Sequence, residues 1–378
     1  MLLNLFYYLD IIVVGGIMDK IIYNVLKTLE NNNYESYIVG GYVRDMLLGN
    51  ISMDIDITTK ARPKEVLELF KEYDVKIHEY GNVSFDISGY KFDITTFRKD
   101  IKYKKSRKPE KIVYIDSFEE DLKRRDFTIN SICLDLDENI IDLYDGRKDL
   151  KRKLVRSIGD PNRKLEEDAL RILRAVRFAS VMKFRLDDEL KRAIIDNREL
   201  IRDLSFERKK EELNKIFCSK HKKYGVKLLR DLKLLDVLDL KDIEYVLRTN
   251  DLIGMWAMIT DKDYAFTKKE KDLIKKIRIV MNEDINDIFV QYKYGSYPIS
   301  VVSDLKGYNT KKIMSKYDKI PIKDREEISI NVEEICSVLG KAPDSFLGNI
   351  FEDIEHKILD GSLVNDKGVL KEYISSNY

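Results

Sequence analysis

The fold is decided by Ser36-Tyr-Ile-Val-Gly-Gly-Tyr-Val-Arg44 and by Asp54-Ile-Asp-Ile-Thr58, which follows shortly after it. A short apolar run that ends in two glycines predicts a buried strand and a tight turn, and residues 41–48 are predicted to form a brief helix. The second segment alternates in polarity, as a strand with one buried face does. Because residues i and i+2 of a strand face the same side, Asp54 and Asp56 are expected to point together, with Ile55 buried behind them.

Asp54 and Asp56 form a pair of like charges with no basic residue beside them in the sequence. Such a pair is costly unless a cation neutralises it, and Mg²⁺ prefers carboxylate oxygens and substrate phosphates as ligands. A third carboxylate would help to hold two metal ions for in-line phosphoryl transfer, and Asp93 is the predicted choice because its strand has an apolar opposite face. Asp86 and Asp126 are alternatives for this third carboxylate. The alternative for the pair itself is an ordinary solvated strand face.

The diglycine turn also suggests ligand binding. Gly40 and Gly41 have no side chains, so the backbone can approach a ligand closely, and the start of the following helix presents free amide hydrogens to an anion. Arg44, one turn into the helix, is predicted to add a fork-shaped clamp for a phosphate. The alternative is a turn that only joins a strand to a helix. An aspartate pair at this distance from the diglycine favours the binding role.

The rest of the chain predicts a small α/β unit followed by a longer helical remainder. Alternating segments between residues 75 and 97 predict strands, so the expected fold class is α+β with a mixed sheet in the first unit. Beyond Gly159-Asp-Pro161, helical periodicity dominates, and residues 165–178 are strongly helical in pattern. The predicted domains are an apolar N-terminal extension at 1–17, a head at 18–157, a helical neck at 158–219, and a helical body and tail at 220–378.

Composition narrows the class of protein. The chain has 378 residues with 68 Lys and Arg against 67 Asp and Glu, so a uniformly basic coat for nucleic acid is excluded. Its three cysteines lie far apart, so neither a disulfide scaffold nor a zinc site is expected, and a reducing compartment, the cytoplasm, fits. Residues 2–17 are mostly apolar, but Asp10 interrupts them and a membrane span needs about 20 residues. No Lys or Arg precedes them, so neither a signal peptide nor a membrane partner is expected. Met18 is the expected natural start, with a packed N-terminal segment as the alternative.

Three later motifs, together with the diglycine and the Asp-x-Asp strand, carry a resemblance. They are Arg124-Arg-Asp-Phe-Thr-Ile-Asn130, Glu167-Asp-Ala-Leu-Arg-Ile-Leu-Arg-Ala-Val-Arg-Phe178, and Phe206-Glu-Arg208 with Glu212-Leu213. In this order they resemble the tRNA nucleotidyltransferase and poly(A) polymerase family, the class II CCA-adding enzymes of the DNA polymerase β-like nucleotidyltransferase superfamily. The resemblance covers residues 37–217 and implies a polymerase β-like head followed by an all-helical neck, body and tail.

The second of these motifs resembles the family's nucleotide-templating helix. On one helix, Asp168, Arg171 and Arg174 follow i, i+3, i+6 spacing and form a single polar stripe. An Asp accepts a hydrogen bond from the exocyclic amine of cytosine or adenine and an Arg donates to their ring acceptors, whereas uracil and guanine show the opposite pattern. The resemblance implies this reading role for Asp168 and Arg171, with Arg174 assisting. The alternative is a surface helix that carries a charge stripe.

The resemblance implies further roles at the level of single residues. Arg125 would contact the phosphates of the incoming nucleotide and Asn130 would lie near its sugar. Glu207 and Arg208 would form a structural ion pair that braces helices. The stretch 98–111, with eight basic and two acidic residues, lies where the family carries a flexible loop, and a solvated charged loop explains its composition equally well.

The leading hypothesis is template-independent addition of CCA, or its terminal part, to tRNA 3′ ends from CTP and ATP, with Mg²⁺ and release of pyrophosphate. A poly(A) polymerase of the same family is the alternative, although residues 78–85 lack the Gly-Arg-Arg-Phe-like run that such members carry. An inactive RNA-binding relative is less favoured because the aspartate pair and the templating pair are present. Lysine-rich stretches at 268–271 and 275–276 are candidates for tRNA phosphate contacts, or else solvated helix faces.

Overall fold

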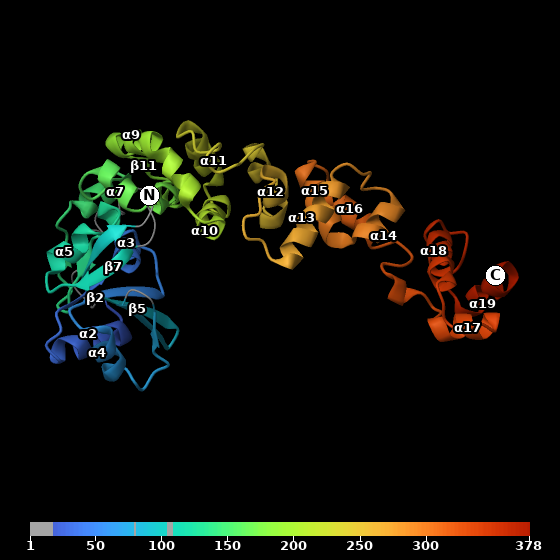
Figure 1. Cartoon of the computed structure of the whole chain (residues 1–378), viewed down its shortest axis with the longest axis horizontal. Helices are drawn as coiled ribbons and strands as arrows, with labels where there is room; N and C mark the ends of the chain where they lie inside the picture. The colour runs from blue at the N-terminus through green and yellow to red at the C-terminus, as the bar shows by residue number, and fades with distance from the viewer. Residues whose placement is uncertain (1–17, 79–80, 104–108) are drawn as a thin grey trace, which may run out of the picture. The chain divides into compact units, whose positions relative to one another are not determined.

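The computed structural model describes residues 18–78, 81–103 and 109–378, with the side chains of 100–103 and 109–111 excepted (Figure 1). The chain divides into two compact units, Met1–Leu238 and Asp239–Tyr378. The extension predicted at 1–17 lies outside the described residues. Within the described part of the chain, every helix is too short or too polar to cross a bilayer. The only division between the units falls after Leu238, so the predicted domain boundaries at 157 and 219 stay predictions.

Unit 1 is built on a seven-stranded mixed sheet with the strand order β3-β4-β5-β2-β1-β8-β9. Strands β2 and β5 pair in parallel, and every other neighbouring pair in this sheet is antiparallel. The predicted α+β class is confirmed. The strands are β1 (Ser36–Val39), β2 (Asp54–Thr59), β3 (Lys76–Ile77), β4 (Asn82–Ile87), β5 (Tyr90–Thr96), β8 (Cys133–Leu134) and β9 (Ile140–Ile141).

The two faces of this sheet differ in chemistry. Helices α2 (Lys20–Asn31) and α4 (Pro63–Leu69) lie beside each other and contact strands of the sheet (Figure 1). On the apolar face, Phe85 stacks on Phe70 at 4.8 Å and on Phe92 at 5.5 Å between ring centroids. Burial of these rings stabilises the unit by removing apolar surface from water. Side chains of the opposite parity, among them those of the aspartate pair, therefore belong to the other face.

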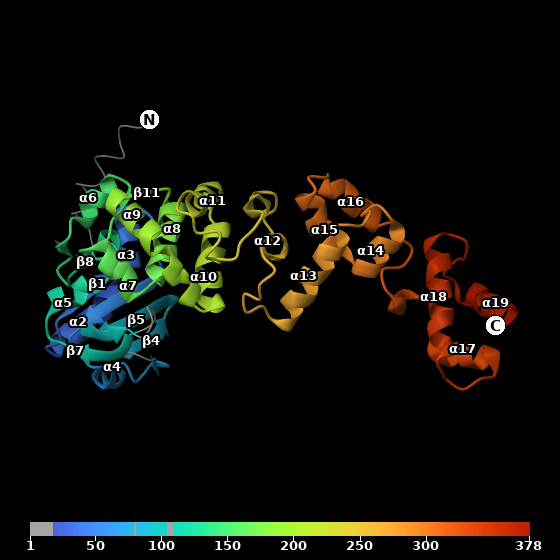
Figure 2. The ribbon, with the colours of Figure 1, turned by 45° about the horizontal axis from the view of Figure 1, so that its top comes forward.

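The helical part of unit 1 follows the sheet. Helix α8 packs against α10 and α11 (Figure 2), and α7 packs against α9. Two short strands, β10 and β11, pair in parallel, so the two residues of β11 are an exception to the all-helical neck that the resemblance implies. The elements are β10 (Leu154–Val155), α7 (Pro161–Glu167), α8 (Leu170–Met182), β11 (Arg185–Leu186), α9 (Asp188–Asn197), η3 (Arg198–Asp203), α10 (Phe206–Phe217) and α11 (Lys222–Asp231).

Two expectations about local structure are corrected. The helix predicted over 165–178 is broken, because Asp168 adopts extended backbone angles (φ −147°, ψ 103°) between α7 and α8. The stretch 98–111 contains two antiparallel strands, β6 (Arg98–Tyr103) and β7 (Pro109–Tyr114), where a loop was expected. Residues 104–108, which include part of the predicted loop, lie outside the described residues. The backbone pairing of the two strands, from Arg98 opposite Tyr114 to Tyr103 opposite Pro109, explains why this basic stretch is not a loop throughout.

Unit 2, residues 239–378, consists of helices joined by loops and turns, and the structure describes all of its residues. The large buried side chains of its first half include Trp256, whose ring centroid lies 4.6 Å from that of Tyr264. A second cluster of buried residues occupies residues 322–374. The elements are η4 (Ile243–Leu247), α12 (Leu252–Ile259), α13 (Lys268–Val280), α14 (Ile288–Tyr294), α15 (Ser296–Leu305), α16 (Thr310–Tyr317), η5 (Arg325–Glu327), α17 (Val332–Leu339), α18 (Phe346–Leu359) and α19 (Lys367–Asn377).

Candidate active site

Unit 1 contains a polar cavity of about 530 Å³ beside the sheet, referred to below as the arginine cavity. Charged groups dominate its walls, with seven arginines against five aspartates. This excess of fixed positive charge suits a polyanionic ligand, and guanidinium groups match phosphate oxygens in pairs. The lining residues are Gly40, Gly41, Arg44, Asp45, Ser52, Asp54, Asp56, Arg98, Arg124, Arg125, Asp126, Asn130, Asp168, Arg171, Arg174, Arg177 and Phe178.

The aspartate pair lies on β2 as the alternation requires. Asp54 and Asp56 are exposed and line the cavity, while Ile55 is buried on the opposite face. The protein surrounding Asp56 desolvates its carboxyl and raises its pKa, an effect that the positive charge of Arg125 opposes and that Asp93 and Asp54 reinforce. No ion pair joins either aspartate to a basic side chain in the described part of the chain. Both carboxylates therefore have oxygens free to accept a cation.

Asp93, the predicted third carboxylate, lies on the strand next to the aspartate pair. Asp93 is the register partner of Asp56 on β5, so the two side chains share a face of the sheet. However, Asp93 does not line the arginine cavity, and its carboxylate lies 3.4 Å from Lys91 Nζ. Among the described residues, no group of three or more His, Cys, Asp and Glu side chains is gathered for a metal ion. The two aspartates of β2 would therefore need ligand oxygens from a substrate to complete a metal site.

The diglycine brings the backbone of α3 (Gly41–Leu47) close to the aspartate pair. Gly40 has φ +80°, and a Cβ atom there would lie 3.2 Å from Asp56 Oδ2. The sequence predicted that amide groups at this helix start would bind an anionic ligand. The backbone N–H of Gly41 instead donates to the Asp56 carboxylate and orients it. The Arg44 guanidinium lines the cavity, but it donates to Asn130 Oδ1 at 2.7 Å and pairs with Asp45 at 2.9 Å.

Asp126 is a structural carboxylate, which removes one alternative for the third metal ligand. It is 8% exposed and accepts hydrogen bonds from Arg174 Nε at 2.7 Å and Asn130 Nδ2 at 3.1 Å. Burial would raise the pKa of Asp126, but Arg174 and Asn130 outweigh burial and lower it to about 2. This network holds Asn130 and Arg174 in fixed positions on the cavity wall.

The Asp126–Arg174 pair yields a stability prediction. Arg174→Met leaves a buried carboxylate without its counter-ion, and we expect unit 1 to lose about 3 kcal/mol of unfolding free energy at pH 7. Because the folded-state pKa of Asp126 is depressed, the difference from wild type is present above pH 4 and shrinks as the pH falls toward 2. Urea unfolding monitored by circular dichroism measures it. Arg202→Met, which breaks the exposed Arg202–Asp236 pair, is the control and should have no measurable effect. Equal losses in both variants would contradict the prediction.

The corner between α7 and α8 carries the predicted base-reading pair. The Asp168 carboxylate accepts from the N–H of Leu170, the first residue of α8, at 3.1 Å, and lies 3.5 Å from Arg208. Arg171, 7% exposed, donates to Glu167 Oε2 at 3.0 Å and to the carbonyl oxygens of Lys164 and Arg124 at 2.8 and 2.9 Å. The single helical stripe expected for residues 168, 171 and 174 is wrong, yet all three line the cavity. The predicted Glu207–Arg208 ion pair is replaced by the contact between Arg208 and Asp168.

Comparison with known proteins extends the relationship over the whole chain. Three family models match: the poly A polymerase head domain at residues 36–156, the RNA and SrmB-binding site of polymerase A at 183–243, and tRNA nucleotidyltransferase domain 2 at 263–374. The CCA-adding enzyme of Lactobacillus helveticus (strain DPC 4571) is 33% identical over 382 residues, which cover 93% of this chain and 95% of that protein. The chain belongs to the tRNA nucleotidyltransferase and poly(A) polymerase family. The CCA-adding enzyme of Anoxybacillus flavithermus is 31% identical, covering 94% of this chain and 96% of that protein.

A solved structure shows the same fold as this member of the family. The crystal structure of the Bacillus stearothermophilus CCA-adding enzyme in complex with CTP superposes with a TM-score of 0.79 at 24% identity. The match covers 94% of this chain and 96% of the other. The CCA-adding enzyme of Thermotoga maritima in complex with tRNA matches with a TM-score of 0.66 at 21% identity. The matched regions include residues of both units.

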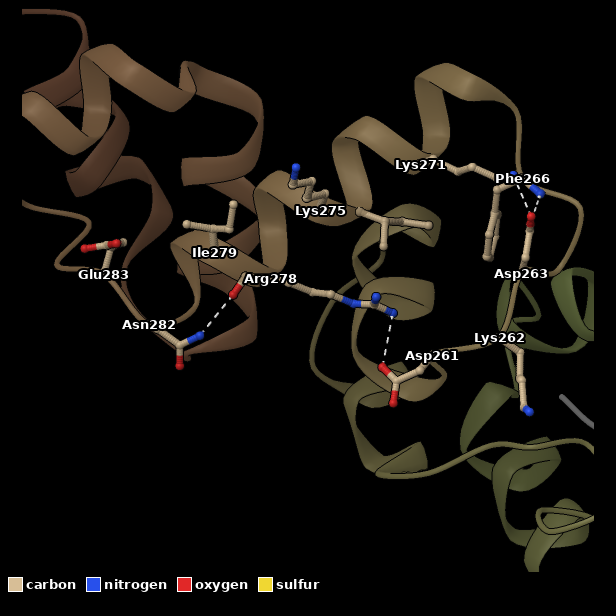
Figure 3. A pocket seen from close by; sticks show the side chains of 11 residues that line it. Asp261, Lys262, Asp263, Phe266, Lys271, Lys275, Arg278, Ile279, Asn282 and Glu283 are labelled. Atoms are coloured by element: carbon tan, nitrogen blue, oxygen red, sulfur yellow. Dashed lines mark hydrogen bonds and ion pairs between the residues drawn. The ribbon is translucent and has the colours of Figure 1, made fainter.

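A second cavity, of about 580 Å³, lies in unit 2 beside α13 (Figure 3). Two of its four basic side chains form ion pairs within the same wall: Lys271 pairs with Asp263 and Arg278 with Asp261. Arg278 also donates to the carbonyl oxygen of Ala257 at 2.8 Å. Asp261 and Asp263 are both in ion pairs, so this cavity differs from the arginine cavity with its Asp54–Asp56 pair. The role of residues 268–271 and 275–276 in holding tRNA stays a prediction.

Sequence reasoning missed Asp121, the most connected carboxylate behind the arginine cavity. It lies in α5 (Phe118–Lys123), with a fully buried side chain that contacts Thr58, Arg98, Arg124 and Arg125. In the sequence it follows Glu119-Glu120, so it has the appearance of an exposed acidic helix. Its position three residues before Arg124 is the one signal that could have indicated it, because i and i+3 residues of a helix are neighbours.

Proposed function

We propose that this protein is a CCA-adding tRNA nucleotidyltransferase that adds CCA, or its terminal part, to tRNA 3′ ends from CTP and ATP without a nucleic-acid template. The observation that carries the proposal is a single cavity lined by the Asp54–Asp56 pair, by arginines and by the Asp168–Arg171 pair. The aspartate pair and the arginines suit a metal ion and a triphosphate, and the Asp168–Arg171 pair suits the edge of a base. The names of the curated relatives and their extent over this chain support the same activity.

The aspartate pair fits a divalent cation. Its donor atoms are carboxylate oxygens on one strand face, and no basic side chain pairs with them in the described part of the chain. Mg²⁺ is the proposed ion, and when it is bound with the substrate it would activate the 3′-hydroxyl and stabilise charge on the phosphate oxygens. The Gly41 N–H fixes the orientation of the Asp56 carboxylate, and Gly40 keeps side-chain atoms away from it.

The remaining residues bind and orient the nucleotide. Arg125 lines the cavity, where its guanidinium can face a phosphate oxygen of the nucleotide. Arg171 is fixed by three hydrogen bonds and keeps its other donors for ring acceptors of a base. Asp168 supplies an acceptor for an exocyclic amine. These assignments select CTP and ATP over UTP and GTP, because mismatched bases leave buried polar groups unpaired.

The proposal is tested with tRNA transcripts that end before CCA, after C, or after CC, each offered a single nucleotide. We expect CTP to extend the first two transcripts and ATP to extend the third, with no extension after chelation of divalent cations. A poly(A) polymerase would instead extend all three with ATP alone and leave CTP unused. The cytoplasmic location, which the three free cysteines Cys133, Cys218 and Cys336 suit, remains part of the same proposal.

A further inference from the structure

The buried carboxylate of Asp121 joins three segments that are far apart in the sequence. Its Oδ2 accepts from the Thr58 hydroxyl at 2.9 Å, and its Oδ1 accepts from the backbone N–H of Arg98 at 3.1 Å. Arg124 Nε donates to Oδ1 at 2.8 Å, and Arg125 Nη2 lies 3.5 Å from Oδ2. Burial raises the pKa of Asp121, but Arg124 and Arg125 outweigh burial and the net pKa is lowered. The group is therefore an anion at neutral pH.

Asp121 lies next to the metal-binding strand face. Thr58 is two residues beyond Asp56 on β2, so the Thr58 side chain, and with it Asp121, is adjacent to Asp56 on the same face. Arg125 acts on both carboxylates, because it contacts Asp121 and its charge also lowers the pKa of Asp56. The guanidinium of Arg125 thus has two anions within its electrostatic reach.

The position of Arg125 decides whether Asp56 stays available. If the guanidinium paired with Asp56, it would occupy carboxylate oxygens that a divalent cation needs and would turn away from the phosphates. The ion pair with Asp121 holds the guanidinium and opposes that movement. A buried carboxylate with a depressed pKa is a strong counter-ion for this purpose, since its charge is little screened by water.

We propose that Asp121 is a positioning residue that holds Arg125 away from Asp56, so that the aspartate pair can bind metal while Arg125 faces the triphosphate. The inference rests on the proposed function and assigns a role to a residue that touches neither substrate nor metal.

The test compares Asp121→Asn with a matched variant, Asp149→Asn. Asp149 is 2% exposed and accepts from Thr128 at 2.7 Å and from Arg156 at 2.9 Å, so its surroundings resemble those of Asp121, but none of these three residues lines the cavity. Mn²⁺ binding to the full-length protein, measured by electron paramagnetic resonance, is the readout independent of turnover. We expect Asp121→Asn to weaken Mn²⁺ binding about tenfold, as loss of a supporting partner does in metal sites. Asp149→Asn should leave it unchanged.

Two further variants separate charge from packing and test the route through Arg125. Asp121→Glu keeps the charge and should restore most of the Mn²⁺ affinity. In an Arg125→Gln background, Asp121→Asn should have no further effect, because the competing cation is gone. Equal losses in Asp121→Asn and Asp149→Asn, or an undiminished effect of Asp121→Asn beside Arg125→Gln, would overturn the inference. Failure of the wild-type protein to extend tRNA would instead refute the proposed function, so the two failures are distinguishable.

Discussion

Asp56→Asn is expected to lower kcat for nucleotide addition by a factor on the order of a thousand or more, which corresponds to about 4 kcal/mol of lost transition-state stabilisation. Asparagine has nearly the same shape as aspartate, but it lacks the negative charge that holds a divalent cation. The Gly41 N–H still has a carbonyl oxygen to bond, so the diglycine turn should keep its conformation. The measurement is single-turnover addition of CTP to a tRNA transcript that lacks CCA.

Binding of tRNA by the Asp56→Asn variant should stay close to that of wild type, since affinity for RNA depends mainly on cations that face phosphates. Filter binding at a fixed salt concentration measures it. Asp54→Asn should act in the same direction as Asp56→Asn. Asp86→Asn is the matched control: Asp86 is exposed on the same sheet, opposite Lys91, and does not line the cavity. Turnover of Asp56→Asn near the wild-type rate would refute the metal assignment.

Asp93→Asn tests whether Asp93 acts as a third metal ligand. Asp93 is adjacent to Asp56 in the sheet register and adds to the negative potential there, yet it lies outside the cavity wall. A loss of kcat as large as that of Asp56→Asn would make it a third ligand. We expect a smaller loss, because the ion pair with Lys91 already occupies its carboxylate.

The first part of the fold could be predicted because its elements are short and locally determined. The brief helix after β1, the diglycine turn and the β2 alternation follow from apolar spacing within a few residues, and the structure shows each of them. The aspartate pair faces one side for the same reason, since the pleat of a strand requires it. The mixed order of the strands could not be derived in this way, because pairing between distant segments depends on the whole sheet.

The break at Asp168 shows where periodicity misleads. Residues 165–178 have helical spacing throughout, but the Asp168 side chain accepts the N–H of Leu170 and so replaces a helical hydrogen bond with a local one. Short polar side chains compete with the helix backbone in this way and favour helix starts. The spacing therefore indicated three residues that line the cavity, but not the geometry that brings them there. Asp121 was missed because Thr58 and Arg98, two of its partners, are far from it in the sequence and reach it only in the folded state.

Simultaneous replacement of Asp168 and Arg171 by alanine is expected to lower kcat/KM for CTP and ATP by a factor of about a hundred or more while leaving the low values for UTP and GTP nearly unchanged. Without an acceptor and a donor that match cytosine or adenine, the pocket no longer favours these two bases over the others. Competition assays with all four nucleotides measure the ratio, on a transcript that lacks CCA for CTP and on a transcript that ends in CC for ATP. Unchanged selectivity in the double variant would remove the base-reading assignment.

Asp168→Asn separates recognition from structural support at this corner. Arg171 also bonds Glu167 and the carbonyl oxygens of Lys164 and Arg124, so its loss disturbs the corner between α7 and α8 as well as the base contact. Asparagine at 168 can still accept the N–H of Leu170, since Asn and Asp cap helices about equally well. Its amide also donates, so it offers UTP a partner that aspartate withholds. We therefore expect Asp168→Asn to unfold at the wild-type temperature and yet to raise the kcat/KM ratio of UTP to CTP about tenfold, which corresponds to one altered hydrogen bond. A lowered melting temperature with an unchanged ratio would assign Asp168 to capping alone.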